Sequence, residues 1–386
     1  MSRALAELPV PTGPAVTGIL DSLSDALAGK TSLLPTPIAH PERAQLLRET
    51  QRVGQPIDSD IALIACTSGS TGTPKGALLS PANLTAAIEA THTRLGGDGR
   101  WLLATPADHI AGLMVLLRSL HAGFTPEVID LTGGFCPGTL CSAITTMAGP
   151  RRYLSLVPLQ LAKALTHPGA TEALAELDAV LVGGQAIAPD LLARAREAGI
   201  TAVTTYGSSE TCGGVVYDGQ PLPGVTVGLS AGRLTLTGAM VARGYRTGDH
   251  PDLAHGTFTT SDLGAIAADG QISVLGRADD MIISGGLKHL PRDVDAALTD
   301  LPSISAAATV GIADDHLGQA MVSLVELADG ASITQARADL AAQIPDKHSR
   351  PRAIYPVSGL PTLPSGKIDR AAVRHIAAQQ YNRKDA

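Results

Sequence analysis

A glycine-rich stretch, Thr67–Gly76, is the feature of this sequence that most restricts the fold around it. Its letters are TSGSTGTPKG. The apolar run 61–66 before it is typical of a buried strand, and Ser80, Pro81 and Asn83 after it are typical of a helix start. Glycines let backbone amides approach an anion, and the hydroxyls and one ammonium add further donors. The stretch therefore predicts a phosphate-binding loop between a strand and a helix.

This loop has two simpler interpretations, a Walker A motif and a flexible linker. The Walker A pattern requires Gly before the lysine and Ser or Thr after it, whereas Pro74 and Gly76 flank Lys75. A flexible linker of small polar residues is the simpler alternative. A linker rarely lies between a buried strand and a helix start, so phosphate binding is favoured.

From Ile61 onwards, short apolar runs alternate with helical patterns. We expect strands at 101–104, 127–131, 153–157, 179–182 and 202–205, and helices at 109–120, 137–147, 158–165 and 190–198. Such repeats predict an α/β fold in which helices cover both faces of a parallel sheet. Sites in such folds lie at the carboxyl ends of the strands. The first sixty residues show only two weak helical patterns, 16–27 and 41–52, and no motif.

After Tyr206 the pattern changes twice. Short β segments at 226–229, 233–237, 258–260 and 271–275 predict a small antiparallel sheet or distorted β-barrel. Past Arg277 we expect helices at 291–298 and 334–343 and strands at 305–310, 320–327 and 354–357. This last region predicts a compact C-terminal α+β domain.

The charge and cysteine content exclude several classes of function. A net charge of -7 without basic runs argues against nucleic acid as a partner. Four cysteines without CxxC spacing fit a reduced, cytoplasmic compartment. We find no signal peptide and no apolar run long enough for membrane insertion. The sequence leaves the oligomeric state open, a homodimer included.

A second polar run, YGSSE at 206–210, follows the expected strand at 202–205. A ring, a hydroxyl and a carboxylate at a strand end suit a base, a phosphate and Mg²⁺, although alone the run would be an ordinary turn. Together with TSGSTGTPKG it resembles the adenylate-forming superfamily, which includes acyl-CoA synthetases, firefly-luciferase-like enzymes and nonribosomal-peptide adenylation domains. GRADD at 276–280 and LPSGKIDR at 363–370 resemble later motifs of the same superfamily.

The resemblance implies ATP, Mg²⁺ and CoA as ligands and assigns a role to individual residues. The residues that it implies for nucleotide binding are Thr67, Ser68, Gly69, Ser70, Thr71, Lys75, Gly184, Gln185, Tyr206, Gly207, Asp262 and Arg277. It implies that Ser209 contacts the α-phosphate, that Glu210 holds the metal, and that Lys367 is the catalytic cation.

The resemblance also implies how the chain is divided. A large ATP- and acyl-binding domain would span 1–277, and a small mobile domain 279–386, with a hinge near Asp279. Gly285, Gly286 and Lys288 would line the tunnel for the thiol, and His109 and Ser208 the acyl pocket.

Two carboxylates compete for the position that would bind ribose. Thr247, Gly248 and Asp249 match the superfamily's T-G-D letters, but the superfamily places this motif about a dozen residues before G-R-x-D-D. Asp262 has that spacing, although Ser261 replaces the glycine. We therefore choose Asp262 and interpret Asp249 as a solvated turn carboxylate.

The run YGSSETCGGVVYDG resembles compact actinobacterial o-succinylbenzoate-CoA ligases of menaquinone biosynthesis. This implies that an aryl dicarboxylate attacks ATP to give an acyl-adenylate, from which CoA then displaces AMP. Arg151, Lys163 and Gln185 are open candidates for binding the second carboxylate. The alternatives are a CoA ligase for another aryl or acyl acid, an adenylation enzyme that loads a carrier protein in trans, and a non-catalytic nucleotide-binding regulator.

Overall fold

The structure of the chain is a computed structural model that describes residues 1–67, 73–362 and 368–382. It divides into two compact units. The first comprises residues 1–230, 235–260 and 266–272, and the second residues 231–234, 261–265 and 273–386. None of the helices in the described ranges combines the length and hydrophobicity needed to cross a lipid bilayer.

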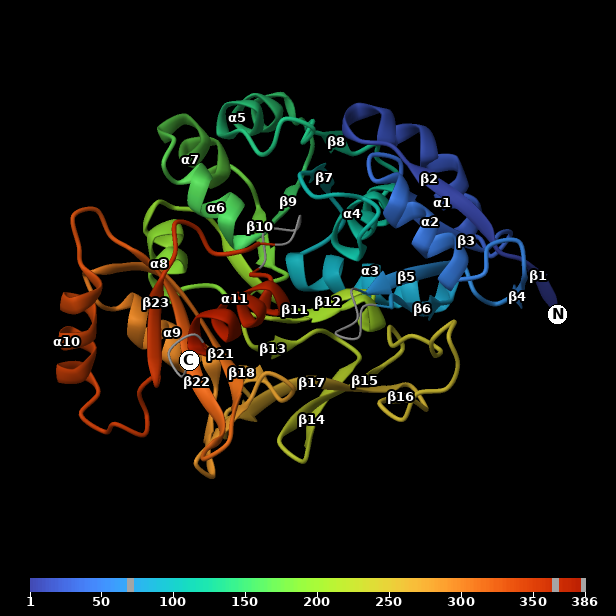
Figure 1. Cartoon of the computed structure of the whole chain (residues 1–386). Coiled ribbons are helices and arrows are strands. Elements are labelled where there is room, and N and C mark those ends of the chain that lie inside the picture. Colours follow the sequence, from blue (N-terminus) through green and yellow to red (C-terminus); the bar gives the residue numbers. More distant parts are fainter. Residues whose placement is uncertain (68–72, 363–367, 383–386) are drawn as a thin grey trace. The chain divides into compact units, whose positions relative to one another are not determined.

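A seven-stranded sheet in the order β13-β12-β11-β10-β9-β7-β8 forms the centre of the first unit (Figure 1). The strands are β7 (Arg100–Leu103), β8 (Glu127–Val128), β9 (Arg152–Leu156), β10 (Ala179–Gly183), β11 (Ala202–Ser208), β12 (Gly213–Tyr217) and β13 (Gln220–Pro221). Strands β7 to β11 are parallel, and β12 and β13 are antiparallel additions at one edge. The predicted α/β fold with a parallel sheet is confirmed.

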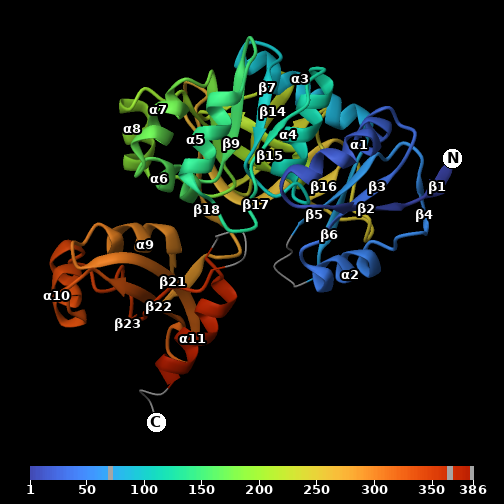
Figure 2. The ribbon, with the colours of Figure 1, turned by 90° about the horizontal axis from the view of Figure 1, so that it is seen from above.

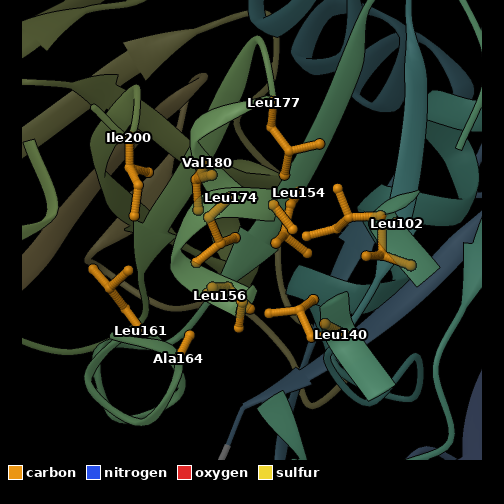
Figure 3. Packing of buried hydrophobic residues seen from close by; sticks show 14 of the residues in the cluster. Leu102, Leu140, Leu154, Leu156, Leu161, Ala164, Leu174, Leu177, Val180 and Ile200 are labelled. Atoms are coloured by element: carbon orange, nitrogen blue, oxygen red, sulfur yellow. The ribbon is translucent and has the colours of Figure 1, made fainter. Parts of the chain in front are cut away.

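Helices cover both faces of this sheet because its strands are apolar on both sides. They are α3 (Pro81–Leu95), α4 (Ile110–His121), α5 (Pro137–Thr146), α6 (Pro158–Ala164), α7 (Pro168–Ala175) and α8 (Pro189–Glu197). A further helix, α1 (Leu20–Leu27), packs on α3 and α4. Leu102, Leu154 and Val180 pack in one buried cluster with residues of α5 to α8 (Figure 3). The alternate residue Trp101 faces the other way, where its ring lies 5.0 Å from the guanidinium of Arg118 on α4.

The first sixty residues contain strands that the sequence did not predict. They supply β2 (Ala6–Val10) and β3 (Leu33–Pro37) to a four-stranded sheet, β2-β3-β5-β6, with β5 (Leu63–Thr67) and β6 (Lys75–Leu79). The prolines of β3 concealed it. The amide of Leu33 points toward β5 and donates to the carbonyl of Ala62, just before that strand. The nitrogens of Pro35 and Pro37, which cannot donate, face the same side of β3, beyond the point where β3 pairs with β5.

The remaining elements of this region are short. They are β1 (Ser2–Ala4), which pairs with β4 (Pro56–Asp58), a 3-10 helix η1 (Gly13–Ile19) and α2 (Pro41–Thr50). A five-stranded sheet follows where the sequence predicted an antiparallel sheet or distorted barrel. Its strands are β14 (Val225–Ser230), β15 (Arg233–Gly238), β16 (Leu253–Ala254), β17 (Thr257–Ile266) and β18 (Ile272–Arg277).

The second unit contains a mixed sheet in the order β20-β19-β22-β21, with β23 paired to β22. Figure 2 shows β21, β22 and β23 of this sheet. Its elements are β19 (Ile282–Ser284), β20 (Leu287–His289), α9 (Pro291–Thr299), β21 (Ile304–Asp314), β22 (Gly318–Leu327), α10 (Ile333–Gln343), β23 (Ala353–Pro356) and α11 (Arg370–Asn382). Two separate apolar clusters lie on the sheet, one beneath α11 and the other beneath α9 and α10. These helices and strands lie where the sequence predicted a C-terminal α+β region.

Candidate active site

Strand β6 places Lys75 in the first unit. The expected strand, loop and helix contain one more element, because the chain forms β6 after the loop before α3 begins at Pro81 with Ser80 as its N-cap. β6 pairs antiparallel with β5, so that Thr67 lies opposite Lys75. On the other side of β6, Ala77 pairs with Tyr245, and the amide of Arg246 donates to Gly76. Both termini of the predicted phosphate loop are thus fixed by strand pairing.

Glu210 lies in a short 3-10 helix, η2 (Ser209–Thr211), directly after β11. Ser209 and Glu210 are both buried. The hydroxyl of Tyr245 donates a 2.7 Å hydrogen bond to Oε1 of Glu210. Burial and the neighbouring Glu210 carboxylate raise the pKa of Tyr245, so this hydroxyl keeps its proton and remains a donor.

The ammonium of Lys75 lies beside the same tyrosine. Its Nζ is 5.5 Å from the ring centroid of Tyr245 and 3.1 Å from Nε2 of His250. The rings of Tyr245 and His250 pack edge to face at 5.5 Å. Sequence reasoning missed both Tyr245 and His250, although they flank the T-G-D letters that we set aside.

The predicted adenine and acyl residues lie at one edge of the seven-stranded sheet. Tyr206, Gly207 and Ser208 form the carboxyl end of β11, and Gly184 and Gln185 follow the neighbouring β10. The register shifts between Tyr206 and Gly207, where β11 and β12 approach so closely that a side chain at Gly207 would overlap the Gly213 carbonyl. A glycine is therefore needed at this position.

Two buried polar atoms at this edge are available to a ligand. Oγ of Ser208 and Nε2 of Gln185 have no hydrogen-bond partner in the part of the chain that the structure describes. His109 is the N-cap residue of α4, close to the same edge, with its Nε2 3.6 Å from Asp108. Burying a polar group without a partner costs free energy. The unpaired atoms of Ser208 and Gln185 therefore indicate a site that binds a polar molecule.

Asp262 and Arg277 lie in the second unit, on β17 and at the end of β18. The guanidinium of Arg277 makes a two-pronged contact with Asp279, at 3.0 Å from Nε and 2.6 Å from Nη2. The hydrogen bonds to Asp279, together with the charges of Asp279, Asp262 and Asp280, raise the pKa of Arg277. The competing carboxylate, Asp249, is an exposed residue of the first unit.

The predicted tunnel residues form a hairpin. Gly285 and Gly286 connect β19 and β20 with positive φ angles of 58° and 81°, which suits a tight two-residue turn. Lys288 is exposed on β20, and so are Ile283 and Leu287 beside the turn. The hairpin thus presents a cation and apolar side chains to solvent.

Five of the predicted site residues lie outside the described residues, namely Ser68, Gly69, Ser70, Thr71 and Lys367. Arg370, three residues after Lys367, begins α11, and its side chain contacts three residues of the second unit. It donates to the Thr309 carbonyl at 2.8 Å and contacts Asp295 at 3.1 Å and Asp280 at 3.6 Å.

The second unit also contains an open cavity of about 410 Å³. Four cationic residues line it, Arg337, Lys347, Arg350 and Arg352, and its lining includes no acidic residue. A cavity of this charge suits an anion with several phosphate groups.

Comparisons with known proteins give a consistent result. Residues 9–245 match the AMP-binding enzyme family, and residues 293–367 match the AMP-binding enzyme C-terminal domain. The chain is 47% identical to a "probable 2-succinylbenzoate–CoA ligase" of Mycobacterium tuberculosis, over 96% of this chain and 98% of the relative. It is 31% identical to a feruloyl-CoA synthase of an Amycolatopsis species, over 82% of this chain and 70% of the relative.

Among solved structures, the fold resembles an o-succinylbenzoate CoA synthetase from Bacillus subtilis in complex with its acyl-adenylate intermediate. The TM-score is 0.76 at 21% identity, over 96% of this chain and 88% of that one.

Proposed function

The chain belongs to the AMP-binding enzyme family, and we propose on this basis that it joins o-succinylbenzoate to CoA, using ATP, through an acyl-adenylate. The reaction would be a step of menaquinone biosynthesis in the cytoplasm. The observation that carries the proposal is the 47% identity to a 2-succinylbenzoate–CoA ligase over nearly the whole of both chains. The buried polar groups at the carboxyl edge of the sheet support it.

In the first step, a carboxylate oxygen of o-succinylbenzoate attacks the α-phosphorus of ATP, and pyrophosphate leaves. The phosphate loop and Lys75 would hold the phosphates, and Ser209 would donate to the α-phosphate. Lys367 would balance the charge that develops between the carboxylate and that phosphate. In the second step the CoA thiol attacks the acyl carbonyl and AMP leaves.

The remaining residues would fix the nucleoside. Tyr206, Gly207, Gly184 and Gln185 would flank the adenine, and Asp262 would accept hydrogen bonds from the ribose hydroxyls because a carboxylate is an acceptor only. Arg277 would approach the ribose or phosphate after release from Asp279. Holding the reactants in this way replaces a collision of separate molecules with a reaction in one complex.

Glu210 fits a magnesium ion. Mg²⁺ prefers hard oxygen ligands and is usually bound by one or two carboxylates together with substrate phosphates and water. Glu210 is a buried carboxylate whose Oε1 accepts from Tyr245, and Oε2 would be the oxygen that binds the ion. Bound there, the ion would neutralise phosphate charge.

The structure favours Gln185 among the three candidates for the second substrate carboxylate. Gln185 follows β10 at the carboxyl edge, and its buried Nε2 has no partner among the described residues. Arg151 precedes β9, at the opposite edge, where its side chain lies against Gly97. Lys163 is exposed near the end of α6.

The second unit supports a phosphorylated co-substrate. CoA carries a diphosphate and a ribose phosphate, and the cavity lined by Arg337, Lys347, Arg350 and Arg352 offers four positive charges. The hairpin with Gly285, Gly286 and Lys288 would line the path of the thiol. We propose domains 1–277 and 279–386 with a hinge at Asp279, whereas the second compact unit comprises residues 231–234, 261–265 and 273–386.

A second candidate function is a CoA ligase for another aryl acid, and the feruloyl-CoA synthase relative favours it. The deciding experiment is thioester formation by the purified protein with o-succinylbenzoate beside ferulate, benzoate, cinnamate and fatty acids. We expect o-succinylbenzoate to give the highest kcat/KM. A higher value for ferulate would support the second candidate, and transfer to a carrier protein but not to CoA would support loading in trans. ATP that is bound but never consumed would indicate a regulator.

A further inference from the structure

The segment Thr247–His250 has no role in the function proposed above. Its T-G-D letters do not have the spacing expected of the ribose motif, and Asp249 is exposed. The same segment nevertheless brings an imidazole to the predicted phosphate-binding lysine. Tyr245 pairs with Gly248, whose φ of 121° turns the chain, and the next turn is fixed by pairing of His250 with Leu253.

The contact between Lys75 and His250 is direct. Nζ of Lys75 lies 3.1 Å from Nε2 of His250, and none of the ion pairs among the described residues includes Lys75. An ammonium can only donate, so Nε2 accepts in this arrangement. An imidazole partner does not neutralise the positive charge of Lys75, whereas a carboxylate in its place would neutralise it and repel a phosphate. The carboxylate of Asp252 lies on the other side of the ring, 3.9 Å from Nδ1.

The other nitrogen of the imidazole is also offered a donor. The amide of Asp252 approaches Nδ1 at 3.2 Å. A neutral imidazole carries one proton, so its two nitrogens cannot both accept. The hydrogen bond from Lys75 to Nε2 therefore competes with the one from the Asp252 amide to Nδ1, and the ring can exchange one for the other. When Nδ1 accepts from Asp252, Nε2 carries the proton and becomes a donor.

We propose that His250 is a ligand of the ATP polyphosphate and of the pyrophosphate that leaves, acting beside Lys75. In the empty enzyme Nε2 accepts from Lys75. When the nucleotide binds, Lys75 turns to the phosphate, the imidazole proton moves from Nδ1 to Nε2, and Nε2 donates to the same anion. Nδ1 then accepts from the Asp252 amide, which keeps the ring in place. This inference rests on the proposed function.

The position of Tyr245 connects this pair to the metal ligand. Its ring packs against His250 and Lys75, while its hydroxyl binds Glu210. Because one buried tyrosine contacts all three groups, an anion that reaches a metal on Glu210 also comes near the two donors. Magnesium is commonly shared between a carboxylate and substrate phosphates, so the phosphates beyond the reacting one are the expected partners.

The test compares three replacements of His250. His250→Ala removes both nitrogens, His250→Asn keeps an amide near the position of Nδ1, and His250→Gln keeps an amide near Nε2. Calorimetry measures the Kd of magnesium-ATP, magnesium pyrophosphate and AMP for each. His255→Asn is the matched control, because it removes an exposed imidazole from the same region at a positive φ that asparagine tolerates.

We expect His250→Ala and His250→Asn to weaken ATP and pyrophosphate binding by about tenfold, the loss typical of a hydrogen bond to a charged group. AMP binding should change less than about twofold because AMP lacks the outer phosphates. His250→Gln should restore most of the affinity, and His255→Asn should match the wild type. Equal loss of AMP and ATP affinity would show a structural role instead, and unchanged affinities would overturn the inference.

These measurements need no acyl acid and are independent of the proposed reaction. A wild-type protein that converts o-succinylbenzoate while His250→Ala binds ATP normally would reject this inference alone. A protein that shows the predicted affinities but activates no carboxylic acid would reject the proposed function alone. If His250→Ala fails to fold, the difference in ATP and pyrophosphate affinity between His250→Gln and His250→Asn still tests the inference.

Discussion

The hydroxyl of Tyr245 donates to the carboxylate of Glu210 at 2.7 Å, and both side chains are buried. The two residues are 35 positions apart in the sequence, and pairing of Ala77 with Tyr245 holds the tyrosine in place. The hydrogen bond fixes the orientation of a carboxylate that we propose as the metal ligand. A ligand that is already oriented loses less freedom when the metal binds.

Tyr245→Phe should therefore raise the Mg²⁺ concentration needed for half-maximal pyrophosphate release. Outer partners of metal ligands typically change metal affinity by about 10- to 100-fold. The measurement is a magnesium titration of wild type and variant. Tyr153→Phe is the control, because its buried hydroxyl donates to backbone carbonyls of Leu95 and Gly97. It should lower stability and leave the magnesium dependence unchanged, and an equal shift in both variants would contradict the role of Tyr245.

The sequence predicted the parallel sheet because its strands and helices have clear, alternating periodicities. It did not predict β2 and β3, because prolines ordinarily argue against a strand inside a sheet. Only the structure shows that the nitrogens of Pro35 and Pro37 face the side of β3 where pairing with β5 has ended. It also missed β6. The letters KGALL begin inside the glycine-rich stretch, at Lys75, and their strand character comes from pairing on both sides.

The candidate site was predictable only where short motifs carry it. Glu210 and Lys75 belong to such motifs, whereas Tyr245 and His250 belong to none. Their place beside Lys75 depends on pairing of β6 with a segment far along the chain. Contacts of this kind follow from topology, and no local pattern encodes them. The assigned roles of Asp262, Arg277 and Lys367 stay predictions, which the next experiments address.

Asp262→Ala should weaken ATP binding far more than Asp249→Ala. Asp262 lies on β17 close enough to Arg277 to influence its pKa, whereas Asp249 is exposed, two residues after a turn. Loss of a carboxylate that accepts from ribose hydroxyls should raise the Kd by about tenfold or more, and loss of Asp249 by less than about twofold. Equilibrium binding of ATP measures both. The opposite ranking would show that the T-G-D letters mark the ribose site after all.

Lys367→Ala should separate the two half-reactions. A cation that stabilises charge during adenylation is not needed once the acyl-adenylate has formed. Pyrophosphate release should fall by at least about 100-fold, while thioester formation from supplied acyl-adenylate should stay close to the wild-type rate. Lys30→Ala, an exposed lysine paired with Asp25, is the control and should alter neither rate. Equal loss of both half-reactions would reject the assigned role.

Arg350→Ala should raise the KM for CoA without affecting pyrophosphate release. Arg350 is one of the four cations in the cavity of the second unit, and a charge-assisted hydrogen bond to phosphate makes a loss of roughly tenfold reasonable. Arg374→Ala removes an exposed cation outside the cavity lining and serves as the control. If both variants raise the KM equally, a general charge effect is responsible and the cavity is not the CoA site.

Asp295 should make the stability of the second unit depend on pH. Burial raises its pKa to about 6, although hydrogen bonds with Thr309 and the nearby Arg370 act in the opposite direction. Between about pH 4 and pH 6 the folded protein therefore holds a proton that the unfolded chain has released. The free energy of unfolding contributed by this group falls as the pH rises through that range, by up to about 3 kcal/mol.

Asp295→Asn removes the titrating group and isolates its effect. Relative to this variant, the wild type should lose stability between about pH 4 and pH 6 and then lose no more above about pH 7. Urea unfolding followed by circular dichroism across this range measures the difference. Asp293→Asn alters an exposed carboxylate of the same helix, α9, and should follow the wild-type curve. Curves for Asp295→Asn and wild type that stay parallel across the range would show that Arg370 keeps Asp295 ionised in the folded state.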